Sequence, residues 1–283
     1  MQPYRMRLGC FLCAFATVAT GYGHSQAACT VTLIKDAPLR LIRGVSVFQG
    51  VEGMRLRQGD VVETGPAATA QVQLECSDAI IELGPSTEAY LFSQSGSAAE
   101  TILLAGWLKG EATSGNQRYV SPLVSATTKG GNVLLHSDDR GTEVFVESGS
   151  ANVSAGSASI ASSREKIFFT RRTGKALMTA NRPSEEFVGQ MPVSFRDALP
   201  SRLSRFTGAK PPSPKREHDV SYAEIESLLT LPSGWRKGMA ERFEPRLQDR
   251  SFRAAIESHI AALPEWKPIL YPDKTASGSN PHQ

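Results

Sequence analysis

Short runs of alternating apolar and polar residues, separated by glycine and small polar residues, dominate the chain from residue 30 to residue 180. A period of two places successive side chains on opposite faces of a β-strand, and glycine-rich breaks are typical of hairpin turns. The pattern is strongest between residues 55 and 91. It predicts fifteen short strands, at residues 30–35, 45–49, 59–63, 70–74, 79–83, 87–92, 100–105, 107–111, 117–120, 123–127, 132–137, 143–147, 151–155, 166–170 and 175–179.

So many short strands have to bury their apolar faces against one another. We therefore expect a mainly β fold, an antiparallel β-sandwich or stacked β-roll, followed by a small C-terminal α-helical region. Gly44, Gly106 and Gly149 each stand at an expected tight turn before an alternating strand. These three glycines, each followed by a strand, indicate either a weak internal repeat or simply the general preference for glycine before strands in hairpin proteins.

A period near four replaces the alternation after residue 220. Ser221 and Glu224 have the spacing of a helix capping box. Two apolar stripes follow, which predict a pair of amphipathic helices that form a hairpin or lie on the β domain. The stripes consist of Trp235, Met239, Phe243 and Leu247, and of Phe252, Ile256, Ile260 and Leu263.

Between these regions, residues 183–220 are predicted to form a basic, proline-rich linker with a short helix at 193–206. The stretch from Arg164 to Arg216, which overlaps this linker, is the most basic in the protein. It leaves two interpretations open, a solvated linker or a surface for an anionic partner such as a cell-wall polymer or lipid headgroups. The basic residues on which the second interpretation depends are Arg171, Arg172, Arg202, Arg205, Lys215 and Arg216.

Large apolar residues return in the proline-rich segment 264–272. Trp266, Ile269, Leu270 and Tyr271 are candidates for docking, either on the protein's own surface or on a partner. The last residues, 274–283, are predicted to be disordered. The expected organisation is thus a signal peptide (1–27), an all-β domain (28–182), the linker (183–220), a helical hairpin with the proline and aromatic segment (221–273), and the tail.

The first residues have the features of a secretory signal. Arg5 and Arg7 precede an apolar run over residues 8–18, and small residues surround Ala27, where cleavage is expected. The run is too short for a transmembrane helix. We expect a mature chain without a transmembrane span, periplasmic or secreted. A retained membrane anchor and a lipid anchor on Cys29 are the alternatives.

Cleavage near Ala27 would remove Cys10 and Cys13 and leave Cys29 and Cys76. An even pair in an oxidising compartment predicts a disulfide, which would stabilise the fold by about 4 kcal/mol in the chain-entropy model. Two buried free thiols are the alternative interpretation. Neither cysteine has a second ligand at the spacing of a zinc site.

Charge and motifs exclude several classes of function. The chain has 31 Lys and Arg against 28 Asp and Glu, and loss of Arg5 and Arg7 leaves 29 against 28. This balance does not favour binding to nucleic acid. No metal, cofactor or nucleophile motif is present, so we expect neither an enzyme nor a cofactor. His136 beside Asp138 and Asp139 is interpreted as part of a hairpin turn in which Gly141 supplies a positive φ.

Several of these stretches together resemble a known family, the FecR-type periplasmic domain. They are Gly44-Val45-Ser46-Val47, residues 56–65 with the strands at 70–74 and 80–83, the Leu103-to-Leu108 phrase, and residues 142–153, which are similar to the closing hairpin of that domain. The resemblance covers about residues 40–155. It implies a β-sandwich or β-roll of FecR type in the cell envelope.

Family members of this type sense an outer-membrane transporter and signal to a sigma factor, which requires a cytoplasmic segment and a transmembrane helix. Neither is expected in this chain, so what the resemblance implies here is a periplasmic β domain for protein interaction, sensing or scaffolding, with an envelope protein as partner. The alternative is a peptidoglycan- or glycan-associated binding module.

Overall fold

The computed structural model describes residues 29–76, 79–92, 100–163, 165–229, 231 and 233–272. The expected signal peptide and the C-terminal tail lie outside these ranges. The described chain is mainly β, with short helices toward the C-terminus, as the alternation predicts. Every strand pair is antiparallel.

The strands are β1 Thr30–Lys35, β2 Leu39–Arg43, β3 Ser46–Gln49, β4 Val61–Thr64, β5 Gln71–Glu75, β6 Ala79–Leu83, β7 Glu88–Phe92, β8 Glu100–Val120, β9 Ser125–Ser137, β10 Gly141–Val146, β11 Ser150–Ala155, β12 Ala158–Ser162, β13 Ile167–Arg172, β14 Met178–Ala180 and β15 Lys215–Asp219. The helices are α1 Glu185–Gln190, η1 Val193–Arg196, η2 Leu203–Phe206, α2 Glu226–Leu229, α3 Ser233–Phe243, η3 Glu244–Gln248, α4 Arg250–Ser258, η4 Pro264–Trp266 and α5 Lys267–Leu270.

The long hairpin of β8 and β9 divides one continuous sheet into two layers. Residues 133–137 of β9 pair with β10, whereas residues 125–129 pair with β11. Between these halves the β8–β9 register shifts after Ala112, and Gly130 and Gly131 have positive φ angles, so the ladder bends. The first layer contains β1, β5, β6, β10, β13 and β14, and the second contains β2, β3, β4, β7, β11, β12 and β15.

The main core fills the space between the two layers. Leu41 and Val62 from the second layer share one apolar cluster with Leu74, Leu135 and Phe169 from the first, and all five side chains are at most 1% exposed. Their neighbours along each strand point to the opposite face, and several of these, such as Ile42 and Phe168, are apolar as well. The alternation in the sequence is therefore the alternation between this core and the two outer faces.

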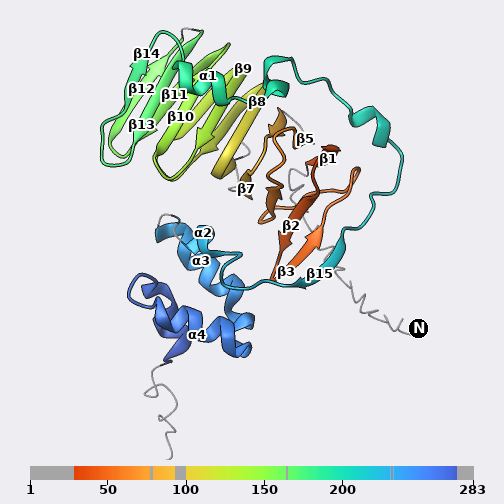
Figure 1. Cartoon of the computed structure of the whole chain (residues 1–283), viewed down its shortest axis with the longest axis vertical. Coiled ribbons are helices and arrows are strands. Elements are labelled where there is room, and N and C mark those ends of the chain that lie inside the picture. Colours follow the sequence, from red (N-terminus) through yellow and green to blue (C-terminus); the bar gives the residue numbers. More distant parts are fainter. Residues whose placement is uncertain are drawn as a thin grey trace, which may run out of the picture.

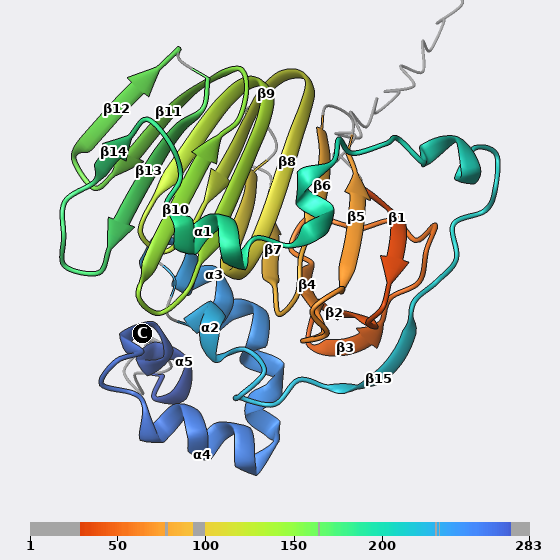
Figure 2. The same ribbon diagram turned by 45° about the horizontal axis from the view of Figure 1, so that its top comes forward.

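Residues 183–214, here called the strap, cross the outer face of the first layer and then pass around the molecule (Figures 1 and 2). Phe187 and Phe195 are buried against Trp107, Leu134 and Phe168 of the sheet. Polar sheet residues also hold the strap's backbone. Lys109, for example, is 1% exposed and its Nζ donates to the Phe195 carbonyl at 2.9 Å.

The chain then returns to the sheet as β15, which pairs with β3 at the edge of the second layer. This strand lies in the segment for which the sequence predicts a linker. The helices from α2 to α5 follow and cover the outer face of the second layer (Figure 2), where Ile42, Val61 and Ile102 share a cluster with Phe243 and Trp266. Within the described ranges, no helix has both the length and the apolar composition to cross a membrane.

Candidate functional site

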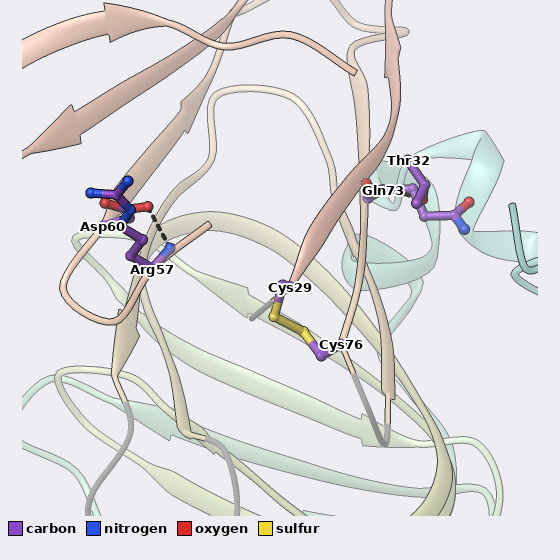
Figure 3. The surroundings of a disulfide bond; sticks show 6 residues. All are labelled: Cys29, Thr32, Arg57, Asp60, Gln73 and Cys76. Atoms are coloured by element: carbon purple, nitrogen blue, oxygen red, sulfur yellow. Dashed lines mark hydrogen bonds between the residues drawn. A yellow bond between two sulfur atoms is a disulfide. The ribbon is translucent and has the colours of Figure 1, made fainter. Parts of the chain in front are cut away.

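The structure joins the two predicted cysteines. Cys29, just before β1, forms a disulfide with Cys76, just after β5, and the two strands pair along their length (Figure 3). Thr32 Oγ1 also donates to the Gln73 carbonyl across this pair at 3.4 Å. A disulfide at this position is consistent with an oxidising, extracytoplasmic compartment.

The four predicted docking residues do not form one exposed patch. Trp266 and Leu270 are 1% and 7% exposed and belong to the apolar cluster beneath the helices, with Ile269 partly buried against it. The Trp266 ring lies 6.2 Å from the ring of Phe252. Tyr271 alone of the four is well exposed, at 58%, so it is the one available to a partner.

The basic residues predicted to meet an anionic partner are largely used within the fold. Arg172 pairs with Glu143 at 3.5 Å, Arg205 with Glu52 at 3.4 Å, and Arg216 with Asp219 at 2.6 Å. Arg202 donates to the side-chain oxygen of Gln73 at 3.3 Å. The positive charge that the sequence assigns to this region is therefore partly neutralised by neighbouring acids.

A second group of arginines, which the sequence analysis did not single out, lines a pocket of about 370 Å³ between the sheet and helix α3. Arg43 binds Asp60 through two hydrogen bonds of 2.9 and 2.6 Å. Arg242 from α3 donates instead to backbone carbonyls, those of Gly44 at 2.9 Å and Gly59 at 2.6 Å. Arg242 thus brings a positive charge to the pocket without a carboxylate of its own.

Burial shapes the electrostatics of this pocket. It lowers the pKa of Arg242, against the opposing effect of Asp60 and Tyr90. Burial also raises the pKa of Tyr90, although the nearby Arg242 charge acts the other way. Both groups keep their ordinary protonation states at neutral pH because their pKa values start far above 7. The pocket is therefore cationic.

The far end of the second layer is an open sheet edge. Strand β12 pairs with β11 on one side, and among the described residues no strand pairs with its other side. Its five residues are exposed or half-buried. The strand carries only small and apolar side chains, without the lysine or proline that proteins use to protect such edges.

The histidine that the sequence brings near two acids has a structural environment. His136 stacks on Trp107 with ring centroids 4.2 Å apart, and its Nδ1 lies 3.3 Å from Glu143. Asp138 accepts hydrogen bonds from the Arg140 side chain and from the backbone N–H groups of Gly141 and Arg140, as in a hairpin turn. Although desolvation acts in the opposite direction, these bonds together lower the pKa of Asp138. In the part of the chain that the structure describes, no three His, Cys, Asp or Glu side chains are grouped to hold a metal ion.

The expected backbone geometry of that turn is wrong in one respect. Gly141 does not have a positive φ. A Cβ at this position would instead lie 2.5 Å from the carbonyl oxygen of Arg171 on β13. Glycine is required here because a neighbouring strand approaches closely, which the sequence of the turn alone does not reveal.

Comparisons with known proteins give only distant likenesses. No family model matches the chain, and no curated protein matches it. Two crystal structures of a candidate anti-sigma factor from Parabacteroides distasonis ATCC 8503 are similar in part. One, at 1.65 Å resolution, has 11% identity over 42% of this chain and 59% of the other, with a TM-score of 0.38.

The other, at 2.50 Å resolution, has 12% identity over 45% of this chain and 63% of the other, with a TM-score of 0.39. This chain therefore spans about three fifths of the length of the chains it resembles. A likeness at this TM-score carries no argument about function. The resemblance to the FecR-type domain therefore still rests on the sequence pattern of residues 40–155.

Proposed function

We propose that this chain is a non-enzymatic, extracytoplasmic interaction module of FecR type, which acts as a sensing or scaffold protein in the cell envelope with another envelope protein as its partner. The signal-like segment 1–27 and the Cys29–Cys76 disulfide support a periplasmic or secreted location. The FecR-like pattern over residues 40–155 supports a β domain that presents strands and loops to a partner.

The observation that carries this proposal is the open edge of β12. Gly156 and Ser157 form a two-residue turn, and the hairpin that they close begins with the pair Ala155 and Ala158. Because such a turn closes with a doubly hydrogen-bonded pair and the pairs then alternate, Ser159 and Ala161 direct their N–H and C=O groups away from β11. These groups can pair with an added strand of a partner.

Replacement of Ala161 by proline tests this proposal. Ala161→Pro removes an outward donor and leaves the inward bonds of the hairpin in place, whereas Ala161→Ser is a matched control that keeps the donor. A photo-crosslinking amino acid at the exposed Ser157 should give a discrete protein adduct in intact envelopes. We expect Ala161→Pro to abolish the adduct and Ala161→Ser to retain it. An adduct indifferent to proline would exclude strand addition, and no adduct in either variant would contradict the proposed function.

A peptidoglycan- or glycan-associated role is the second candidate, and the cationic pocket at Arg43 and Arg242 favours it. Sedimentation of the purified protein with isolated peptidoglycan separates the two. Retention that disappears between low and high salt would support the polymer, because added salt screens the charge attraction that would hold such a complex. Crosslinking to a protein through β12, without such retention, would support the interaction module.

A further inference from the structure

A short extended segment between β3 and β4 presents two arginines side by side. Met54 and Leu56 are at most 1% exposed, whereas the intervening Arg55 and the following Arg57 are exposed. The Val31 N–H donates to the Met54 carbonyl at 3.0 Å, and the Leu56 N–H to the Cys29 carbonyl at 2.8 Å. The segment is therefore fixed to β1 next to the disulfide, and it holds both arginines on its outer side.

The strap forms the opposite wall of a cleft. Arg43, Arg55 and Arg57 face Pro211, Pro212, Ser213 and Pro214 across a space of about 380 Å³. This cleft shares Arg43 and Arg57 with the pocket beside α3, and it shares Arg55 with a further hollow near Phe206 and Lys210. We call this continuous surface, defined by Arg43, Arg55, Arg57 and residues 211–214, the arginine groove.

The positive charge of the groove is not balanced within the described chain. Asp60 already forms an ion pair with Arg43. Its Oδ2 also accepts a hydrogen bond from the Arg57 backbone N–H at 2.7 Å (Figure 3). The side chains of Arg55 and Arg57 make no hydrogen bond or ion pair with any described residue. No described acid lines the cleft between these arginines and residues 211–214. Two guanidinium groups thus remain available to an outside anion.

We propose that the arginine groove binds an extended acidic segment of a protein partner with carboxylates at alternate positions. Arg55 and Arg57 are two residues apart on an extended segment, which separates them by about 7 Å along the chain. Acidic side chains at positions i and i+2 of an extended peptide lie on one side with the same spacing. Planar guanidinium groups match carboxylates with paired hydrogen bonds, the usual basis of acidic-motif recognition by arginine clusters.

The strap wall favours recognition through side chains rather than through a backbone ladder. Pro211, Pro212 and Pro214 have no N–H to donate, so an added strand could not pair with this wall. The groove and the β12 edge therefore offer different kinds of contact. This inference rests on the proposed function, because it names the chemistry of a protein partner at a second surface.

Fluorescently labelled peptides test the inference directly. The probe is a ten-residue peptide with alternating Glu and Ser. A block peptide, Glu-Glu-Ser-Ser-Glu-Glu-Ser-Ser-Glu-Ser, carries the same charge but never places two Glu two residues apart. Binding to the purified full-length protein is measured by anisotropy at low salt. Arg55→Gln with Arg57→Gln is the test variant. Arg182→Gln with Arg196→Gln, two exposed arginines outside the groove, removes the same charge as a control.

We expect the alternating peptide to bind about tenfold more tightly than the block peptide, and the groove variant to lose that binding by about tenfold or more. The control variant should remain within about twofold of the unaltered protein. Equal losses in both variants would overturn the inference, because they would show non-specific charge attraction. Binding of polygalacturonate or soluble peptidoglycan fragments in preference to the peptide would also overturn it.

The outcome is separable from that of the proposed function. If neither peptide binds while Ser157 still crosslinks through β12, the arginine groove has been misassigned and the interaction module stands. If the alternating peptide binds through Arg55 and Arg57, the inference holds whether or not β12 accepts a strand.

Discussion

Buried and half-buried charges in this protein connect the sheet to the segments that surround it. Lys109 reaches the carbonyls of Phe195 and Asp197 in the strap, at 2.9 and 2.5 Å. Arg242 reaches the carbonyls of Gly44 and Gly59 from the helical side, at 2.9 and 2.6 Å. Removing Lys109 would leave the buried Phe195 carbonyl without this donor, which costs about 1–3 kcal/mol. Removing Arg242 should cost less, because Gly44 is exposed and water can replace the donor there.

Glu88 on β7 gives a prediction about pH. Desolvation raises its pKa from the ordinary 4.5 to about 7, and the charge of Glu63 acts in the same direction, while a 2.5 Å hydrogen bond from Ser227 Oγ and the Arg40 charge oppose the rise. Between these pH values the folded protein holds a proton that the unfolded chain has released. Stability should therefore fall as pH rises from about 4.5 to 7, by up to about 3 kcal/mol from this group.

Glu88→Gln keeps an oxygen for Ser227 and removes the charge, so it should be more stable than the unaltered protein at pH 7.5 and equal to it near pH 4.5. Urea denaturation at pH 4.5, 5.5, 6.5 and 7.5 measures this difference. Glu241→Gln, at an exposed position, is the control and should follow the unaltered curve. A Glu88→Gln curve parallel to the unaltered one at every pH would refute the assignment.

The predicted turn glycines provide a matched pair of substitutions. Gly44, Gly106 and Gly149 all have positive φ, at +59°, +91° and +82°. A Cβ on Gly106 would lie 2.5 Å from the Thr87 Cα, whereas a Cβ on Gly44 would meet nothing within 4 Å. We expect Gly44→Ala to cost about 1 kcal/mol from backbone strain, and Gly106→Ala about 3 kcal/mol or more because the backbone of Thr87 must also move. Chemical denaturation of both variants decides this, and equal costs would mean that packing adds nothing.

At the scale of elements, glycine is a less specific sign of where a strand ends than apolar alternation is of where a strand runs. The sequence predicts separate strands at 100–105, 107–111 and 117–120, but these are one strand, β8. Likewise the predicted strand at 132–137 and residues 125–127 of the one predicted at 123–127 belong to a single strand, β9. Gly106, Gly130 and Gly131 have positive φ inside the ladder, so they mark bends of continuing strands, and a bend and a turn have the same local composition.

The sequence does not predict strand β15, for a different reason. Its residues are mostly exposed, so Lys215–Asp219 lacks the alternation that reveals a half-buried strand. Pairing with β3 is a long-range contact that no local pattern encodes. The pairing of Cys29 with Cys76, by contrast, follows from simple counting once the signal segment is set aside.

The disulfide leads to a prediction for β1 and β5. The bond closes a loop with a sequence separation of 47, for which the chain-entropy model gives about 4 kcal/mol. Reduction, or Cys29→Ala with Cys76→Ala, should lower the free energy of unfolding by about that amount. Urea denaturation with and without reductant measures it. The double variant is its own control, since reductant should leave it unchanged, and a loss below 1 kcal/mol would contradict the prediction.

For the whole molecule, the C-terminal third encloses the β layers rather than following them (Figures 1 and 2). The stripes at Met239, Phe243, Phe252 and Ile256 predict helices with a buried side, and these residues do pack in the cluster shared with β2, β4 and β8. The path of the strap could not be predicted in this way. The first layer's outer face includes the polar residues Gln73, Glu82 and Lys109. Their sequence pattern predicts a solvated surface, yet all three are at most 1% exposed.

The predicted domain boundaries at residues 182 and 220 remain a prediction from composition. The strap and the helices that follow these boundaries both make buried contacts with the β layers. The local sequence pattern also does not show which surface would bind a partner. Arg55 and Arg57 differ in sequence from the paired arginines of the strap in no obvious way, and only the three-dimensional fold shows which guanidinium groups lack acids.

The strap's attachment can be tested at its aromatic anchor. Phe187 is 1% exposed and its ring lies 5.0 Å from that of Trp107 and 5.1 Å from that of Phe168. Phe187→Ala should cost about 3–5 kcal/mol of local stability, because the site loses an aromatic ring between two others. We expect limited proteolysis to cleave the variant within residues 183–206 while its far-UV circular dichroism stays that of the sheet. Val193→Ala, at a position that is 70% exposed in the same strap, should leave cleavage unchanged. Glu75 on the sheet also accepts a hydrogen bond from Ser201 Oγ of the strap at 2.6 Å. Equal resistance of the two variants would show that the hydrogen bonds with Lys109 and Glu75 hold the strap without the aromatic anchor.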